Sequence, residues 1–195
     1  MATGRPRTFD KNRALDQALE VFWRKGYEGA SICDLTAAMG INPPSLYAAF
    51  GNKQSLFRQA LDRYVEIQGA NICEALAVPK ARDAIAALLR GYARSLTDKS
   101  NPAGCLIVQG ISGAGEHAQC IRDMLNAKRA AGEKDVRERL KRAKAEGELP
   151  EDADPAALAR YFSTVSQGMA VQAAGGASRK DLERIADMAL RAWPD

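Results

Sequence analysis

Residues 31–50 read SICDLTAAMGINPPSLYAAF, and this stretch decides the fold. Ser31 and Asp34 have the S-x-x-D spacing of a capping box, in which two side chains satisfy free N–H groups at a helix start. A short helix is therefore predicted from Ser31 to about Met39. Gly40 follows it, and glycine adopts the left-handed backbone of a tight turn without steric cost. The first half of the stretch thus predicts one short helix and the turn that ends it.

A second short helix is predicted directly after this turn. Asn42 is a good N-cap, and Pro43 then stands at the first helical position, where its missing N–H is not needed. This helix would end at Phe50. Because helices of about eight residues are marginal in isolation, both short helices need longer helices to pack against. Apolar residues at helical spacing predict these partners at residues 10–25 and 52–79.

Two short helices joined by a tight turn are typical of a helix-turn-helix, in which the second helix lies in the major groove of DNA. The second helix must then have a buried inner face and an outer face of small or polar residues. Ile41, Leu46 and Phe50 can face inward. The residues left at or near the outer face are Pro43, Pro44, Ser45, Tyr47, Ala48 and Ala49. The same pattern is also compatible with a helical hairpin inside a bundle.

Helical periodicity continues along the rest of the chain, and alternating strand patterns are nearly absent. The predicted helices cover residues 85–96, 117–146, 155–174 and 178–193, with a short, imperfect helix in the glycine-rich stretch 100–116. We therefore expect an all-α protein.

Composition and charge agree with a globular protein of this size. Of 195 residues, 46% are hydrophobic and 27% are charged, and the net charge is +4. The positive charge is concentrated near the N-terminus, because Asp10 is the one acidic residue among residues 1–13. The basic residues of this stretch are Arg5, Arg7, Lys11 and Arg13. Such an arm could contact DNA phosphates, or it could be a solvated tail.

The cysteines and the motifs that are missing narrow the class of protein. Cys33, Cys73, Cys105 and Cys120 have no CxxC spacing, and the start MATGRPRTFD lacks the apolar region of a signal peptide, so we expect free thiols in the cytoplasm. No apolar run is long enough to span a membrane. The chain has one histidine and no G-x-S-x-G, phosphate-loop or dinucleotide motif, so we expect neither an enzyme nor a cofactor.

The stretch from Arg7 to Tyr64 resembles the DNA-binding domain of TetR-type regulators, above all in SICDLTAAMGINPPSLYAAFGNKQSLF. The family's pattern has a Ser/Thr-capped helix, a Gly-hydrophobic-Ser/Asn turn and a Leu-Tyr-x-x-Phe-x-x-Lys-x-x-Leu run. The matching residues are Ser31, Gly40, Ile41, Asn42, Leu46, Tyr47, Phe50, Lys53 and Leu56. Two departures are Thr36, where the family usually has Ala, and the Pro43-Pro44 pair.

The resemblance implies two domains and a mode of action. Residues 8–68 would form a three-helix helix-turn-helix DNA-binding domain, and residues 69–195 a helical effector-binding and dimerisation domain. The protein would be a homodimer that pairs through its last two helices. It would repress transcription and leave a palindromic operator when an unknown small molecule binds.

The resemblance also implies which residues contact DNA. The phosphate contacts would come from Ser31, Ser45, Tyr47 and Lys53. The residues nearest the base edges would be Asn42, Pro43, Pro44 and Ala48. Arg5 or Arg7 would add minor-groove contacts, as the arms of other helix-turn-helix proteins do. Proline and alanine can touch a thymine methyl group but make no bidentate hydrogen bonds, so this helix is poor in base-reading side chains.

Candidate effector-binding residues lie in the C-terminal half. The helices expected to surround a cavity carry Leu88, Tyr92, Cys105, Met124, Phe162 and Met169. Apolar residues at helical spacing are, as the alternative, simply core residues. No charge cluster indicates what kind of ligand such a pocket would take.

Two features of the sequence that contain cysteine could support thiol modification or metal binding. Cys105 follows Asn-Pro-Ala-Gly and is expected in the first turn of a helix, where a thiol more readily becomes a thiolate. Release from the operator could then follow thiol modification at Cys105, whereas the alternative is a small buried apolar residue. His117 and Cys120 form an H-x-x-C pair of the kind that can hold copper or zinc, but so sparse a spacing favours an exposed histidine at a helix start, and we assign no metal.

A DNA-binding transcriptional regulator is therefore the expected function. The rival hypothesis is a helical interaction or structural protein that binds no specific DNA. Steep salt dependence and preference for a palindrome would distinguish the two.

Overall fold

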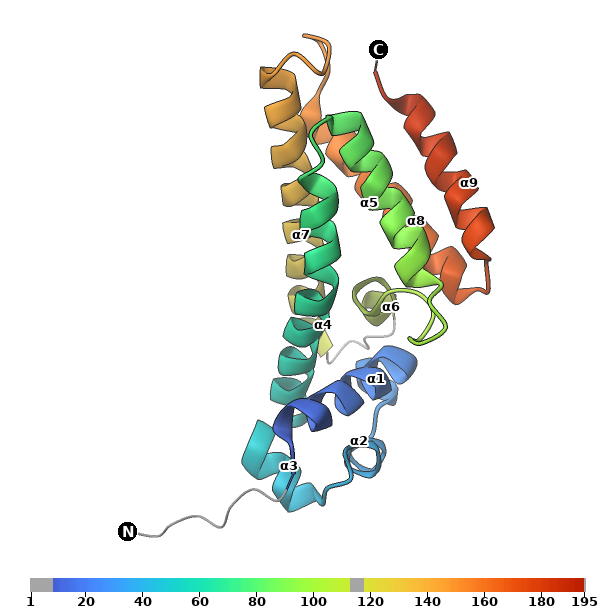
Figure 1. Cartoon of the computed structure of the whole chain (residues 1–195). Helices are drawn as coiled ribbons and strands as arrows, with labels where there is room; N and C mark the ends of the chain where they lie inside the picture. The colour runs from blue at the N-terminus through green and yellow to red at the C-terminus, as the bar shows by residue number, and fades with distance from the viewer. Residues whose placement is uncertain (1–8, 113–117, 195) are drawn as a thin grey trace.

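The computed structural model describes residues 9–112 and 118–194, which form nine α-helices and no strand (Figure 1). The helices are α1 (Lys11–Gly29), α2 (Ile32–Met39), α3 (Pro43–Phe50), α4 (Lys53–Leu76), α5 (Ala81–Leu96), α6 (Leu106–Ser112), α7 (Gln119–Ala145), α8 (Pro155–Ala174) and α9 (Arg179–Ala189), followed by a 3-10 turn at Leu190–Ala192. The all-α prediction is confirmed. Arg5, Arg7 and His117 lie outside the described residues.

The two short helices begin and end as their local sequence predicts. The Ser31 hydroxyl accepts a hydrogen bond of 3.0 Å from the Asp34 N–H, and the Asp34 carboxylate accepts one of 3.0 Å from the Ser31 N–H. Gly40 is left-handed, with φ 63° and ψ 31°. The Asn42 side chain then accepts a hydrogen bond of 2.9 Å from the Ser45 N–H and caps α3.

Three element boundaries differ from the sequence prediction. Gly26 has φ 68° and ψ 178°, so it breaks α1 as expected, but the helix resumes and continues to Gly29. The helix predicted to run to Pro79 ends at Leu76. Within residues 100–112, the described part of the glycine-rich stretch, the α-helical part is α6, which directly follows Cys105.

Apolar side chains form two hydrophobic cores. The N-terminal core takes residues from α1 to α4 and from α6 and α7, and its fully buried members include Phe22, Leu35, Leu46, Phe57, Leu106 and Leu125. The C-terminal core takes residues from α5, α7, α8 and α9, and its fully buried members include Ile85, Leu89, Leu140, Phe162 and Leu182. Cys105 packs against both cores, so it lies where they meet.

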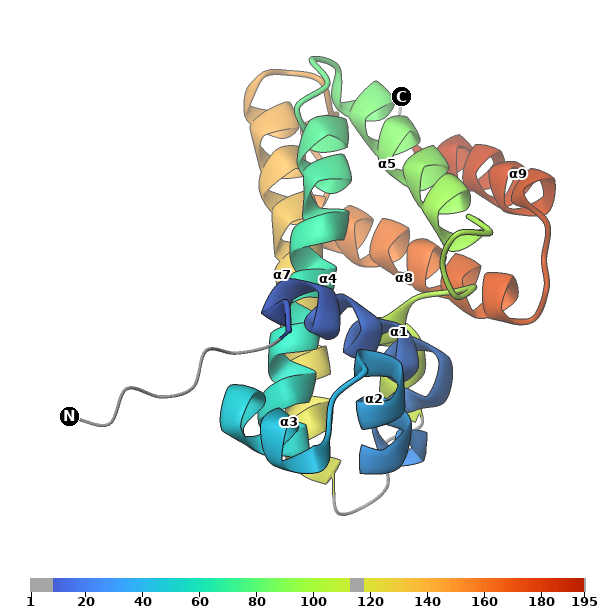
Figure 2. The same ribbon diagram turned by 60° about the horizontal axis from the view of Figure 1, so that its bottom comes forward.

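Helix α4 connects the two parts of the molecule. It begins beside α3 and extends along α7 to the region of α5 (Figures 1 and 2). Arg139 of α7 holds the far end of α4 in place, because its guanidinium donates hydrogen bonds of 3.2 Å to the Val78 carbonyl and 2.7 Å to the Pro79 carbonyl. Because residues of α4 belong to both cores, a movement of α4 would displace side chains in both.

Helices α8 and α9 carry apolar side chains that their own chain does not cover. Tyr161 and Val171 on α8 are 40% and 57% exposed, and Ile185 and Met188 on α9 are 36% and 59% exposed. Large exposed apolar groups of this kind mark surfaces that contact another molecule. Among the described residues, no helix has the length and apolar character needed to cross a bilayer.

Candidate DNA interface and the Cys105 junction

Helix α3 has the two faces that a recognition helix requires. Leu46 and Phe50 are 0% and 2% exposed and attach the helix to the N-terminal core. On the opposite face Tyr47 is 50% exposed, and Pro43, Pro44 and Ala48 are also exposed. Helices α2 and α3 lie at the end of the molecule remote from the C-terminus (Figure 1). Their outer surface is thus free to approach a ligand as large as duplex DNA.

An ion pair supports the position of α2. The Lys25 ammonium of α1 lies 2.6 Å from the Asp34 carboxylate. The hydrogen bond from Lys25 and then those from Ser31 hold the pKa of Asp34 well below its ordinary value. The Ser31 hydroxyl also donates to this carboxylate over 2.7 Å, so its one proton is already engaged. A phosphate contact by Ser31 would therefore have to displace that bond.

The unusual Thr36 fits without strain. It is 7% exposed, and its hydroxyl donates to the Ile32 carbonyl over 2.8 Å. A buried hydroxyl is tolerated when it has such a partner. Threonine can therefore take the place of the usual alanine at this position.

Lys53, at the start of α4, is held beside α1. Its ammonium lies 4.6 Å from the centre of the Tyr27 ring, and partial burial lowers its pKa. An ammonium over an aromatic face is attracted by the ring and keeps its other donors free. The Tyr27 ring thus holds the Lys53 ammonium at the end of the molecule where α3 lies. In a similar way, the Lys11 ammonium lies 5.2 Å from the Phe50 ring.

Cys105 lies at a junction of polar side chains from two helices. The Tyr64 hydroxyl of α4 donates a hydrogen bond of 3.2 Å to Cys105 Sγ. Burial, and after it the electrostatic effect of Cys105, raises the pKa of Tyr64. Burial and, after it, Cys105 and Asp135 also raise the pKa of Tyr92 on α5. Both phenols therefore keep their protons to a higher pH than an ordinary tyrosine does.

The junction extends to α1 through aromatic contacts. The Trp23 ring lies edge-on to the Tyr64 ring, with centroids 4.8 Å apart and planes at 87°. Trp23 is 8% exposed, and its indole N–H has no hydrogen-bond partner among the described residues. Neither Trp23 nor Tyr64 was predicted as a site residue, although a buried phenol in an apolar stripe usually needs a partner for its hydroxyl.

The six residues predicted to line an effector pocket are not all neighbours. Cys105 and Tyr92 both pack against the C-terminal core. Leu88, Phe162 and Met169 are 4%, 1% and 1% exposed and belong to the C-terminal core. Met124 packs against the N-terminal core instead. None of the six lines the groove of about 1040 Å³ that lies between α4, α5 and the start of α9.

Of the possible metal pair, only Cys120 lies among the described residues. Cys120 is exposed, and it lines a small hollow with Met124 at the start of α4. Within residues 9–112 and 118–194, no group of three or more His, Cys, Asp or Glu side chains could hold a metal ion. All four cysteines are free thiols.

Two family models match this chain. The model described as "Bacterial regulatory proteins, tetR family" matches residues 14–60. The model described as "Tetracyclin repressor-like, C-terminal domain" matches residues 81–189, more than half of the 195 residues. The chain belongs to the TetR family. It is therefore a DNA-binding transcriptional regulator, as its sequence predicted.

Relatives of this TetR-family protein align with it along nearly their whole length. It is 36% identical over 197 residues to the HTH-type transcriptional repressor ComR of Escherichia coli (strain K12), with 98% of this chain and 92% of ComR covered. It is 31% identical to the HTH-type transcriptional repressor BdcR of the same organism, with 95% and 90% covered.

A solved TetR-family structure has nearly the same fold. A cysteine mutant of the TetR family transcriptional regulator CifR, complexed with 26-bp double-strand operator DNA, superposes with a TM-score of 0.95 and 43% identity. The match covers 98% of this chain and all of the CifR chain. The fold described above is thus one that a relative keeps while it is bound to DNA.

Proposed function

We propose that this TetR-family regulator is a repressor that binds a palindromic operator as a homodimer. The observation that carries the proposal is helix α3, with Leu46 and Phe50 buried and Tyr47, Pro44 and Ala48 exposed at the end of the molecule. The likeness to CifR on operator DNA supports it, and so do the names of ComR and BdcR, which are both called repressors.

The proposal divides the work between two domains. Residues 8–68 would bind DNA, and residues 69–195 would bind the effector and the second subunit. The two family-model matches, 14–60 and 81–189, support this division. Helix α4 belongs to both domains, because it runs from Lys53 to Leu76 without a break. It would therefore carry the effector signal to the DNA-binding domain.

The base contacts would come from the first residues of α3, namely Asn42, Pro43, Pro44 and Ala48. The Asn42 carbonyl oxygen is used to cap the helix, but its amide group keeps two donors. These donors could reach acceptor atoms in the major groove, whereas the prolines and Ala48 could pack against thymine methyl groups. Specificity for the DNA sequence would thus rest on the Asn42 amide and on the fit of α3 to the thymine methyl groups.

The phosphate contacts would surround these residues. Tyr47 and Ser45 on α3 and Lys53 on α4 would make them. Ser31 would join them only if its hydroxyl turned away from Asp34. Arg5 and Arg7 would extend the contacts into the minor groove.

Dimerisation would use the exposed apolar side chains of α8 and α9. Tyr161, Val171, Ile185 and Met188 are each more than one third exposed. Pairing these helices with a second copy would remove that apolar surface from water, which is favourable. A two-fold symmetric protein would in turn require two symmetric half-sites, so the dimer supports a palindromic operator.

Release from the operator would follow a change at the effector domain, through a small molecule or through covalent modification of Cys105. In an addition to an activated C=C bond, Cys105 Sγ loses its proton to solvent and forms an S–C bond as the C=C π bond breaks, and the resulting enolate takes a proton from solvent. The adduct would need space where Tyr64 and both cores now pack. The added group would therefore push α4 and its attached domain. The site of action would be the bacterial cytoplasm, and no catalytic activity is assigned.

Selection of bound DNA from a random pool tests the repressor proposal. The expected result is a two-fold symmetric site whose affinity falls steeply with salt. Weak binding without sequence preference would instead favour a helical interaction protein.

Treatment with N-ethylmaleimide tests release through Cys105. In a protein whose other three cysteines are changed to serine, alkylation should release the selected operator. Adding the Cys105→Ser substitution should abolish release. Equal release with and without Cys105 would contradict this part of the proposal, but it would leave the repressor role standing.

A further inference from the structure

Helix α8 has a solvent-facing side that carries no charged residue. Phe162, Met169 and Ala173 lie on its buried side and attach it to the C-terminal core. The one charged residue of α8, Arg160, pairs with Glu133 of α7 over 2.8 Å. A helix side that stays in water normally carries charged residues, so this face has the character of one that is covered. The uncharged face, read at helical spacing, consists of Ala157, Tyr161, Thr164, Val165, Gly168, Val171, Gln172 and, directly after the helix, Gly175.

Gly168 stands at the centre of the uncharged face. Thr164 and Gln172 lie about one turn away from it on either side, and Tyr161 and Gly175 lie about two turns away. A glycine inside a helix is destabilising relative to alanine. A Cβ added at Gly168 would meet no other part of the described chain within 4 Å. Packing among the described residues therefore does not require glycine here, whereas the close approach of a second backbone would.

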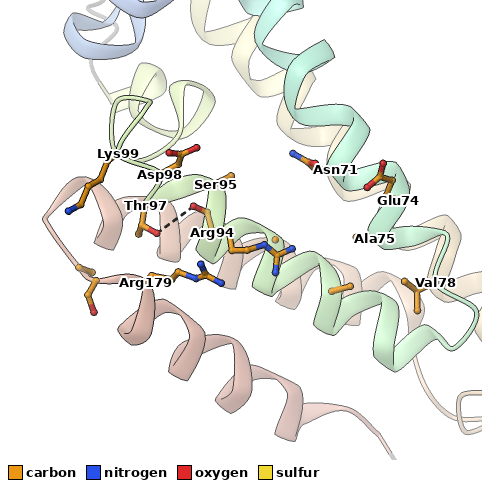
Figure 3. A pocket seen from close by; sticks show the side chains of 14 residues that line it. Asn71, Glu74, Ala75, Val78, Arg94, Ser95, Thr97, Asp98, Lys99 and Arg179 are labelled. Carbon is orange, nitrogen blue, oxygen red and sulfur yellow. Dashed lines mark hydrogen bonds between the residues drawn. The ribbon is translucent and has the colours of Figure 1, made fainter.

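The groove beside α5 has the opposite character. It has a volume of about 1040 Å³ and lies between α4, α5 and the start of α9, and no residue of α8 lines it. Figure 3 shows charged side chains along it, among them Glu74, Arg94 and Arg179. The core of a protein interface is depleted of charged residues, so the uncharged face is the better surface for a tight contact.

A second copy of this chain is the partner that fits the uncharged face. In a two-fold symmetric dimer, a residue on the axis meets the same residue of the other copy, so a charge there would face a like charge. Gly168 and its neighbours avoid this repulsion, and the missing side chain allows two backbones to approach. The face also contains Tyr161 and Val171, two of the exposed residues that the proposed dimer would cover.

We propose that the α8 helices of two subunits cross at Gly168, antiparallel, with the two glycines in contact on the symmetry axis. The inference rests on the proposed homodimer and adds to it the point of contact and the register of the two helices. An antiparallel crossing places each residue before Gly168 opposite the residue at the same distance after it in the other subunit. A parallel pair would instead place Tyr161 against Tyr161 and Gly175 against Gly175, which crowds one end and leaves a gap at the other.

The antiparallel register joins complementary side chains. A large ring meets a glycine, a hydroxyl meets an amide, and two branched apolar side chains meet each other. Sliding the helices past one another by one turn would move both glycines off the axis and force the backbones apart. The pairs in this register are Tyr161 with Gly175, Thr164 with Gln172 and Val165 with Val171.

Disulfide trapping tests the register. Thr164→Cys and Gln172→Cys are made separately in a protein whose three exposed cysteines are replaced by serine. The two proteins are refolded together from urea and oxidised with diamide. The mixture should form a covalent dimer, because positions 164 and 172 of different subunits would lie within the separation of about 7 Å between Cα atoms that a disulfide allows. Neither variant alone should do so, since two copies of the same position would lie about 12 Å apart along the helices.

The outcomes separate the register from the dimer. Cross-linking that is equal in the mixture and in the single variants, or absent from all three, would overturn the crossing at Gly168. Sedimentation equilibrium of the unsubstituted protein measures the dimer itself. A monomer in that measurement would overturn the proposed homodimer and this inference with it, whereas a dimer that fails to cross-link would overturn the inference alone.

Gly168→Leu tests the contact point. A side chain at this position would hold the two backbones apart, so we expect dimer affinity to fall about tenfold or more. Gly132→Leu is the matched control, because Gly132 also lies inside a long helix, α7, and has the same free space around it. Both variants replace a helical glycine by a good helix former, so each subunit should stay folded. Equal dimer affinities of the two variants would overturn the contact at Gly168.

Discussion

The Tyr64 hydroxyl on α4 donates a 3.2 Å hydrogen bond to the sulfur of Cys105, which lies 41 residues further along the chain. Tyr64 also contacts Trp23 on α1, and Cys105 packs against both hydrophobic cores. This single bond therefore links the helix that holds the DNA-binding domain to the point where the two cores meet. A chemical change at the sulfur reaches α1 and α4 through direct contacts.

Trp23 should report on the state of Cys105. We expect alkylation with N-ethylmaleimide to change Trp23 emission, because the added group displaces the Tyr64 ring that lies 4.8 Å from the indole. The measurement uses a Trp193→Phe protein whose exposed cysteines are replaced by serine. The same treatment of a version with Cys105→Ser is the control, and a change of equal size there would show that the signal comes from elsewhere.

Stability should fall above pH 10 because of Tyr64 and Tyr92. Both phenols have a raised pKa in the folded protein, so the unfolded chain loses their protons first. Unfolding is then favoured as the pH rises from 10 toward the folded pKa values, by about 1.4 kcal/mol per pH unit for each tyrosine. Tyr92→Phe should reduce the slope by about that amount in urea titrations between roughly pH 10 and 11. An unchanged slope would show that Tyr92 ionises as freely in the folded protein.

Tyr47→Ala and Lys53→Ala should weaken binding to all DNA sequences alike. Both side chains are assigned to phosphates, which are the same in every sequence. For Lys53→Ala the slope of log K against log salt should also become shallower by about 0.9. Fluorescence anisotropy with the selected operator and with a scrambled duplex measures both effects. A loss confined to the operator would mean that the residue reads bases instead.

Met188→Glu should weaken the dimer. Met188 is 59% exposed on α9, and a carboxylate there would be buried without a partner when two copies pair. We expect a loss of about tenfold or more in dimer affinity, measured by sedimentation equilibrium, with a parallel loss of operator binding. Ala131→Glu, at an exposed position on α7, is the matched control. Equal behaviour of the two variants would place the dimer interface elsewhere.

Two glycine substitutions should have opposite effects on stability. Gly40 has φ 63°, and an added Cβ would meet no atom within 4 Å, so Gly40→Ala costs only the strain of the left-handed backbone, about 1–2 kcal/mol. Gly132 lies within α7 and also has free space around it, so Gly132→Ala should stabilise the protein by about 0.5–1 kcal/mol. Urea unfolding measures both. A loss of stability from Gly132→Ala would mean that the α7 glycine has another role.

The boundaries of the short helices could be predicted because they depend on neighbouring residues. The partners of a capping box are only three positions apart, and the predicted box of Ser31 and Asp34 forms, as does a second one of Ser178 and Asp181. Asn42 acts through its side-chain oxygen, which accepts a hydrogen bond from the Ser45 N–H, and Gly40 acts through its left-handed backbone. These hydrogen bonds and steric limits involve only residues that are close together in the sequence. The helix boundaries could therefore be predicted without knowing the rest of the fold.

The outward-facing apolar residues show what periodicity leaves open. Tyr161 and Ile185 have the spacing of core residues, yet they are 40% and 36% exposed on α8 and α9. Helical spacing says that a residue lies on an apolar face, but not whether that face packs on its own chain or on another. The direction of such a face depends on how the helices pack against one another.

By itself, the sequence determined an all-helical chain, a helix-turn-helix at residues 31–50 and, through its motif, the TetR family. The packing of the helices, by contrast, decides that Cys105 bonds to Tyr64 and touches both cores, that Met124 packs against the N-terminal core, and that a charged groove opens beside α4. Caps and turns follow from residues a few positions apart. The junction and the groove join residues that are dozens of positions apart, and their meeting depends on the packing of whole helices, which spacing along the chain does not encode.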